Sequence, residues 1–123
     1  MLRITLASVL LSVFLSTSTI AAPVIQRRGE SFSGDGTFYQ PGLGSCGKQN
    51  DESDMIAALS SSLMSQGHYC GKQITVEYGG KSVDVTIVDS CPGCSEGDMD
   101  LSPAAFSELA SFDKGRIPIT WSL

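Results

Sequence analysis

The sequence VTIVDSCPGCSEGDMDLSPAAF, residues 85–106, carries the clearest structural signals of the chain. Residues 83–88 alternate apolar and polar side chains with a period of two, which predicts a strand that ends at Asp89. Asp100 closes a second short apolar run, and Ser102-Pro103 then predicts a helix start, with serine as N-cap and proline in the first helical position. Two carboxylates therefore stand where strands give way to turns, which is where functional side chains are often placed.

Short alternating runs predict a mainly β domain. The predicted strands are residues 37–39, 73–78, 83–88, 99–101 and 115–121. Gly79-Gly80 separates the second from the third of these, which predicts a β-hairpin. Residues 30–36 are polar and rich in glycine, so we expect a disordered or extended lead-in. Because no strand–helix alternation is present, a small closed β-barrel is favoured over a doubly wound sheet.

Two short helices are expected in the connections between strands. Residues 55–59 follow a cluster of acidic residues that would favour a helix N-terminus, which indicates a short helix ending near Ser60. A second helix is predicted from Ser102 to about Ala110, with Phe106 on its apolar face.

The N-terminal segment predicts export from the cell. Arg3 precedes an apolar run over residues 4–20, and small residues follow, which is typical of a secretory signal peptide over residues 1–21. A membrane anchor is the competing interpretation, but the run is short for a span and rich in serine and threonine. We therefore expect a secreted, extracellular protein.

The dibasic pair Arg27-Arg28 indicates a second cleavage, which would make residues 22–28 a propeptide and residues 29–123 the mature domain. A flexible basic tail explains the pair equally well. The mature domain would hold five basic residues and all thirteen acidic residues, a net charge of −8. This balance argues against nucleic acid and anionic membrane surfaces as partners, and it leaves a neutral polymer such as polysaccharide open.

The four cysteines predict two disulfides, each worth about 2–4 kcal/mol. Cys91 and Cys94 have the spacing of zinc ligands, but Cys46 and Cys70 form no second close pair, and His68 stands alone. A thioredoxin-type redox site is disfavoured because no strand–helix–strand unit surrounds the pair. Among the three connectivities, those that bond Cys91 and Cys94 to distant partners are favoured, since longer loops constrain the unfolded chain more. We expect no metal and no other cofactor.

Seven segments of the chain stand in a characteristic order. They are residues 36–39, 42–47, 55–60, 69–72, 88–94, 100–106 and 115–121. Together these segments resemble the rare-lipoprotein-A-like double-psi β-barrel family and, more narrowly, small secreted fungal expansin-like proteins of the loosenin type. The resemblance implies a mainly β fold: a six-stranded, disulfide-stabilised double-psi β-barrel with two short helices, crossed loops and a shallow groove that binds glycan.

The resemblance also implies a binding site for polysaccharide. Mapped onto matching positions, its residues are Thr37, Tyr39, Asp89 and Asp100, with the carboxyl of Asp100 as the key polar group and no catalytic residue assigned. Cys91 stands where bacterial expansins place an aromatic side chain. Related endoglucanases carry a second acid near the first strand, and residues 39–42 contain none here. Because inverting hydrolysis needs an acid and a base, we do not expect an enzyme.

Structural roles compete with these assignments. Asp100 also fits an acceptor for the turn before the helix, and Asp89 fits a turn former before a Cys-Pro sequence. Phe38 and Tyr39 are neighbours on a strand, so one should face the core and the other solvent. Trp121 is expected to pack in the core or at its rim.

The favoured function is therefore a secreted, monomeric, expansin-like domain that binds cellulose or chitin and loosens the cell wall without hydrolysis. The alternative is a protein-binding module, such as a cysteine-protease inhibitor or an effector, which would bind through the barrel's loops. A lytic enzyme acting on peptidoglycan is a third, weaker hypothesis, since the second acid is missing.

Overall fold

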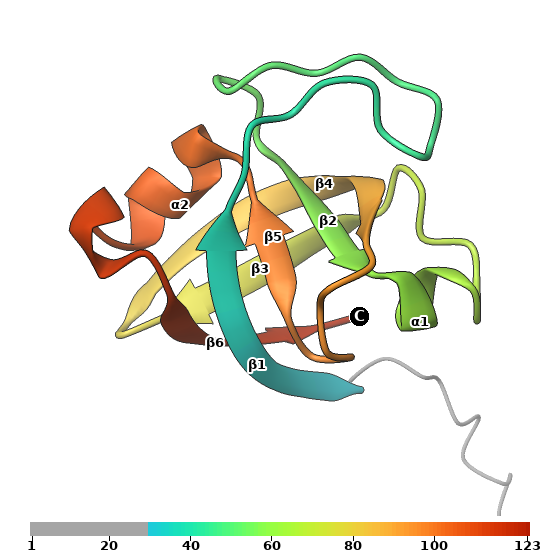
Figure 1. Cartoon of the computed structure of the whole chain (residues 1–123). Coiled ribbons are helices and arrows are strands. Elements are labelled where there is room, and N and C mark those ends of the chain that lie inside the picture. Colours follow the sequence, from blue (N-terminus) through green and yellow to red (C-terminus); the bar gives the residue numbers. More distant parts are fainter. Residues whose placement is uncertain (1–29) are drawn as a thin grey trace, which may run out of the picture.

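The computed structural model describes residues 30–123, and the predicted signal peptide and propeptide lie outside them. Six strands form a closed barrel in the order β1-β5-β2-β4-β3-β6 (Figure 1). The strands are β1 (Ser31–Phe38), β2 (Ile56–Ser60), β3 (Gln73–Tyr78), β4 (Lys81–Cys91), β5 (Met99–Leu101) and β6 (Ile117–Ser122). The helices are α1 (Ser61–Met64), α2 (Pro103–Leu109) and the 3-10 turn η1 (Phe112–Lys114). The predicted mainly β barrel with two short helices is confirmed.

The barrel mixes parallel and antiparallel pairing. β1 is parallel to β5, and β2 is parallel to β4, whereas the remaining neighbours are antiparallel. Parallel partners cannot be joined by a tight hairpin, so longer connections lead from one strand to its parallel neighbour. The predicted hairpin of β3 and β4, with its Gly79-Gly80 turn, is confirmed.

The predicted helix at residues 55–59 is wrong, because most of this segment is strand β2. All five residues of β2 are buried, since the strand lies between β4 and β5 and is covered on both faces. A strand buried on both faces reads as a continuous apolar run and lacks the period of two. The helix α1 begins only at Ser61, where the hydroxyl of Ser60 accepts a hydrogen bond from the main chain of Leu63 at 3.1 Å.

The polar lead-in before residue 37 is also strand, because β1 begins at Ser31. Its partner is β6, and the ring of Phe32 stacks on Trp121 with centroids 4.2 Å apart. Trp121 is buried as expected, and its indole nitrogen donates to the carbonyl of Gly97 at 3.0 Å. The N-terminal half of the chain thus contributes more strand than its composition indicates.

The core fills the barrel, and α2 closes one end of it. Ser102 caps α2 as predicted, accepting a hydrogen bond from the main chain of Ala105 at 3.2 Å. The side chains of Phe106 and Leu109 point from α2 into the core. The largest fully buried apolar side chains are Phe106, Leu59, Ile87, Met99, Leu101, Leu109, Ile117, Ile119, Val76 and Val85. Among the described residues, no helix has the length and apolar character needed to cross a membrane.

Both predicted disulfides are present, but the favoured pairing is wrong. The bonds join Cys46 to Cys70 and Cys91 to Cys94. The entropic argument for distant partners fails because a tight turn follows β4, in which the main chain of Cys94 donates to the carbonyl of Cys91 at 3.2 Å. This turn brings the two Cα atoms within 5.4 Å, a normal disulfide separation.

The two disulfides are predicted to differ in their contribution to stability. The Cys46–Cys70 bond has a sequence separation of 24, and that of Cys91–Cys94 is 3. Loop-closure entropy then gives about 3–4 kcal/mol for the first bond and about 2 kcal/mol for the second. Urea unfolding of the double variants C46S/C70S and C91S/C94S measures both losses, and an equal or inverted order would contradict the prediction.

Candidate functional site

Strand register brings together residues that are far apart in the sequence. Thr37 of β1 is the cross-strand partner of Asp100 of β5, Asp100 is that of Ala58 of β2, and Ala58 is that of Asp89 of β4. We call these four residues the carboxylate row. Strands lie 4.7–4.9 Å apart, so the Cα atoms of Asp89 and Asp100 are about 9–10 Å apart, one on each side of the small Ala58.

Asp100 lies at the centre of this arrangement and is half-buried. Its Oδ1 accepts a hydrogen bond from the hydroxyl of Thr37 at 2.9 Å. Burial raises the pKa of Asp100 above its ordinary value of 3.8, and the negative charge of Asp89 adds to this. The hydrogen bond from Thr37 and the positive charge of Arg116 oppose the increase without cancelling it. Asp100 therefore holds its proton to a higher pH than an ordinary aspartate does; its carboxylate form accepts hydrogen bonds, and its protonated form can also donate one.

Asp89 is fixed in orientation by the main chain. Its Oδ1 accepts hydrogen bonds from the amides of Ser45 at 2.9 Å and Ser90 at 2.8 Å. Gly44 makes the first bond possible, because a Cβ there would lie 2.2 Å from the carbonyl oxygen of Val88. Only glycine lets the loop approach β4 this closely. The two amide donors hold this carboxylate oxygen in place.

Tyr39 is influenced by the charges of both carboxylates. Burial raises the pKa of Tyr39 to about 12, and the charges of Asp89 and Asp100 contribute to the increase. Its hydroxyl therefore stays protonated at neutral pH and remains a hydrogen-bond donor in the site. The neighbouring Phe38 lies with its ring 4.7 Å from that of Phe106, but it is 36% exposed and Tyr39 is half-buried, so the expected division into one core ring and one solvent ring is wrong.

A polar groove of about 450 Å³ opens beside the row. It is lined by Asp35, Thr37, Cys91, Gly93, Cys94, Ser95, Asp98, Asp100 and Arg116, and we call it the carboxylate groove. Two of the four residues predicted from sequence, Thr37 and Asp100, line it directly. Tyr39 and Asp89 do not line this hollow, but their electrostatic coupling to Asp100 places them next to it.

Sequence reasoning missed three charged residues of the groove. Arg116 forms an ion pair with Asp35, with 2.9 Å between Nη1 and Oδ2. Asp98 accepts hydrogen bonds from the amides of Asp35 at 2.8 Å and Ser95 at 2.9 Å, so it fixes the loop after the disulfide. No local pattern in the sequence marks these residues, because Arg116 and Asp35 are 81 residues apart along the chain.

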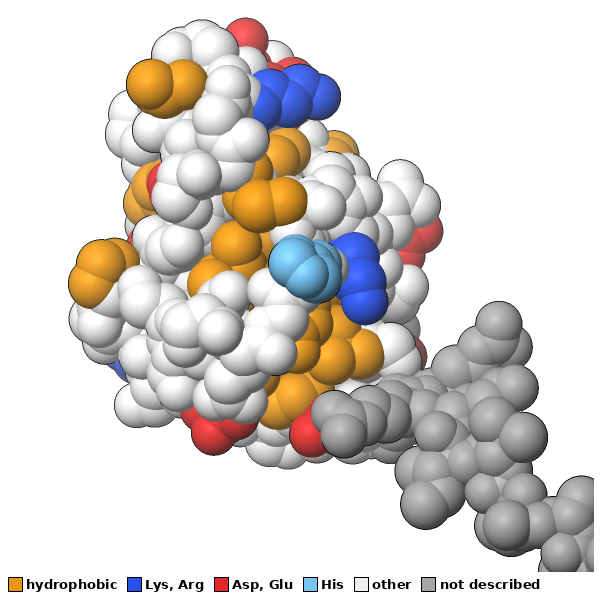
Figure 2. All heavy atoms as spheres, turned by 90° about the vertical axis from the view of Figure 1, so that its right-hand side faces the viewer, with side chains coloured by type: hydrophobic (Ala, Val, Ile, Leu, Met, Phe, Trp, Pro, Cys, Tyr) orange, Lys and Arg blue, Asp and Glu red, His pale blue; other side chains and the backbone are white. Residues whose placement is uncertain are grey.

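The single histidine, His68, is not among the residues that line the carboxylate groove. Figure 2 shows His68, in pale blue, beside a band of exposed apolar side chains. From this part of the chain, Met64 and Tyr69 are partly buried against the core, and the ammonium of Lys72 lies 5.4 Å from the centre of the Tyr69 ring. Within residues 30–123, no group of three or more histidine, cysteine or acidic side chains is arranged to hold a metal ion.

Comparison with known proteins agrees with this architecture. A family model described as lytic transglycolase, a double-psi β-barrel domain, matches residues 31–121. Allergen Asp f 7 of Aspergillus fumigatus is 38% identical over 96 residues, which are 73% of this chain and 35% of the allergen. The chain spans about a third of the length of the two fungal allergens that it matches.

Two solved structures share the fold. The Streptomyces papain inhibitor is 32% identical, with a TM-score of 0.70 and coverage of 77% of this chain and 94% of the inhibitor. A mutant of the Clavibacter michiganensis expansin, solved in complex with cellohexaose, is 32% identical, with a TM-score of 0.67 and coverage of 74% and 48%. The resemblance to rare-lipoprotein-A-like and expansin-like proteins is confirmed.

The raised pKa of Asp100 predicts a specific pH dependence of stability. The folded protein keeps this proton at a pH where the unfolded chain has lost it, so the contribution of Asp100 is present below pH 3.8 and is lost as the pH rises through the raised pKa. The Asp100→Asn variant has no titrating carboxyl at this position, so it does not lose stability in this way as the pH rises. Its free energy of unfolding should therefore increase relative to that of the wild type across this interval, as measured by urea unfolding at several pH values.

Thr37→Val should raise the pKa of Asp100 further, because valine removes the hydrogen bond that stabilises the carboxylate. Carboxyl ¹³C NMR titration of both proteins, with Asp100→Asn to assign the signal, measures the change. A pKa of Asp100 at or below 3.8 in the wild type would contradict the raised pKa on which this prediction rests.

Proposed function

The chain belongs to the double-psi β-barrel family described as lytic transglycolase, and from this premise we propose that it binds neutral cell-wall polysaccharide in the carboxylate groove. The polymer would be a β-linked chain such as cellulose or chitin, and binding would loosen contacts between chains without cutting them. We also propose that the protein is secreted, because its first 21 residues have the pattern of a signal peptide.

The observation that carries this proposal is the register of the carboxylate row. Thr37, Asp100 and Asp89 share one face of the barrel wall, because directly paired residues on neighbouring strands point to the same side. Together with the protonated hydroxyl of Tyr39, they present hydrogen-bond donors and acceptors beside an open groove. Sugar hydroxyls both donate and accept hydrogen bonds, so a glycan chain satisfies such a surface better than an apolar ligand does.

The same geometry supports binding without hydrolysis. Inverting hydrolysis places a general acid and a general base on opposite faces of the sugar ring. Asp89 and Asp100 share one face of the sheet, so both would meet the same side of a bound sugar. Asp89 is also tied by two main-chain amides, which limits its freedom to position a water molecule.

Asp100→Asn should weaken retention on insoluble polysaccharide about five- to tenfold, because a charge-assisted hydrogen bond is lost in a half-buried site. Binding isotherms on cellulose and on chitin measure the change. Asp113→Asn is the matched control, since it makes the same chemical change at an exposed position in η1, outside the residues that line the groove. It should bind like the wild type.

Absence of retention on every wall polymer would contradict the proposed function. Release of reducing ends from the polymer, lost in Asp100→Asn, would instead identify a hydrolase. Because the Streptomyces relative is a papain inhibitor, inhibition of papain is also measured with both variants. Inhibition that survives Asp100→Asn, without polysaccharide binding, would favour a protein-binding module.

A further inference from the structure

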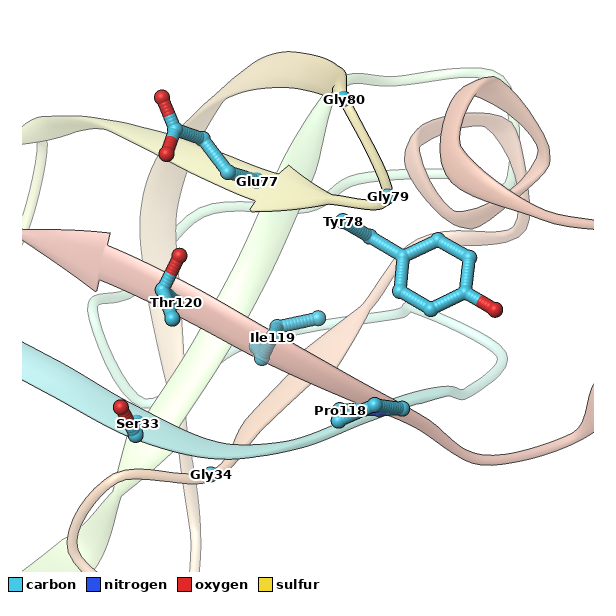
Figure 3. Close-up of a pocket in the computed structure, with 9 residues that line it drawn as sticks. All are labelled: Ser33, Gly34, Glu77, Tyr78, Gly79, Gly80, Pro118, Ile119 and Thr120. Atoms are coloured by element: carbon cyan, nitrogen blue, oxygen red, sulfur yellow. The ribbon is translucent and has the colours of Figure 1, made fainter.

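A second hollow lies at the end of the β3–β4 hairpin, about 380 Å³ in volume (Figure 3). The side chains that matter for its chemistry are Ser33, Glu77, Tyr78, Pro118 and Thr120, and we call it the hairpin hollow. None of these residues lines the carboxylate groove.

The hollow exists because the pairing between β3 and β6 stops early. The two strands pair only at Val76 with Trp121 and at Glu77 with Thr120. The next residues along each strand, Tyr78 and Ile119, are not paired with each other. Pro118 follows on β6 and has no amide hydrogen with which to extend a ladder. The strands separate there and leave a cleft between the hairpin end and β6.

The turn above the cleft carries no side chains. Gly79 and Gly80 have positive φ values of 54° and 82°, a conformation that favours glycine. No atom lies within 4 Å of a Cβ built at either position, so the turn is also unobstructed. The hollow is therefore open to a long, thin ligand.

Its walls combine one aromatic ring with several polar groups. The ring of Tyr78 is partly buried against the core, and Figure 3 shows it between the glycine turn and Pro118. Ser33 is paired with Thr120, and Thr120 with Glu77, so three polar side chains stand side by side on neighbouring strands. Among residues 30–123, these three side chains make no hydrogen bonds to other protein groups, which leaves them available to a ligand.

This combination fits a sugar chain that passes over the strand end, because Glu77 and Tyr78 are neighbours on β3 and project to opposite faces, so they would meet different parts of the ligand. The flat ring of Tyr78 offers an apolar surface with a polar tip, and the neighbouring hydroxyls and carboxylate offer hydrogen bonds. Only one of the surrounding side chains, Glu77, is charged, and it is acidic. The site therefore favours an uncharged, hydroxyl-rich ligand over an anionic one.

The hairpin hollow and the carboxylate groove lie along the same strand. Ser33, Asp35 and Thr37 alternate on β1, so their side chains share one face. Ser33 lines the hairpin hollow, whereas Asp35 and Thr37 line the carboxylate groove. The distance along β1 from Ser33 to Thr37 is about 13 Å, which an extended oligosaccharide can span.

We propose that the hairpin hollow is a second binding site for the same neutral polysaccharide chain, continuing the carboxylate groove along β1. This inference rests on the proposed function. It assigns Tyr78 as the stacking surface, with Thr120, Ser33 and Glu77 as hydrogen-bond partners. A ligand that is long enough to reach both sites would bind more tightly than a short one, because the two sites act on one chain.

NMR titration of the ¹⁵N-labelled protein with soluble oligosaccharides tests the proposal. Cellohexaose and chitohexaose are the long probes, and the corresponding trisaccharides are the short ones. A hexasaccharide should shift the amide signals of Gly79, Gly80 and Thr120 together with those of Thr37 and Asp100.

Thr120→Arg places a long side chain in the hollow from an exposed strand position. It should weaken hexasaccharide binding about tenfold, through lost hydrogen bonds and stacking, and leave trisaccharide binding in the groove unchanged. Gln73→Arg is the matched control, because it adds the same side chain at an exposed position of β3 that lines no hollow described above. It should bind both probes like the wild type.

The outcomes separate this inference from the proposed function. Hexasaccharide shifts at Thr37 and Asp100 without shifts at Gly79 and Gly80 would overturn the second site alone. Equal affinities for Thr120→Arg and Gln73→Arg would do the same. Shifts at the hairpin with an extended peptide, and none with sugars, would assign the hollow to a protein ligand. Shifts at neither site with any sugar would overturn the proposed function as well.

Discussion

The register of four neighbouring strands is the constraint on which the site depends. Thr37, Asp100 and Asp89 come from β1, β5 and β4, and hydrogen-bonded pairing through β2 fixes their spacing. A shift of one residue in any of these pairings would turn a carboxylate towards the core, because neighbouring residues on a strand point to opposite faces. The buried apolar residues that alternate with them make such a shift costly, since Met99 and Leu101 on each side of Asp100 are fully buried. The same strand register therefore sets both the packing of the core and the geometry of the site.

Glycines allow the loops to lie close enough to complete this arrangement. A Cβ at Gly34 would lie 2.3 Å from the main chain of Gly97, and a Cβ at Gly97 would lie 2.1 Å from the carbonyl oxygen of Ser33. The two segments therefore touch through their backbones. This contact lies beside the carboxyl of Asp98, which accepts a hydrogen bond from the amide of Asp35 at 2.8 Å. Gly44 acts in the same way at the other end of the row, where it lets a loop amide reach Asp89. Both ends of the site are thus held by main-chain contacts that larger side chains would prevent.

The parts of the fold that follow from local signals could be predicted from the sequence. The Gly79-Gly80 hairpin and the helix after Ser102-Pro103 are specified by residues that lie within each element. Strand β2 was mistaken for a helix because its burial on both faces removes the alternation that marks a strand. The four predicted site residues came from the family resemblance, and their convergence depends on pairings that no local pattern encodes. Arg116 and Asp98 were not predicted for the same reason, since their partner Asp35 lies far from both in the sequence.

The charges of the site argue for an uncharged ligand. A bound polymer must replace water around Asp89 and Asp100, and a neutral sugar can do this by hydrogen bonding without bringing further negative charge. A polyanion would meet both carboxylates in a domain whose described residues carry thirteen acidic and five basic side chains. Arg116 offers little attraction to such a polymer, because its guanidinium is already paired with Asp35 at 2.9 Å. Burial raises the pKa of Asp100, and the negative charge of Asp89 adds to this increase, so the neighbourhood of Asp100 already disfavours negative charge before any ligand binds.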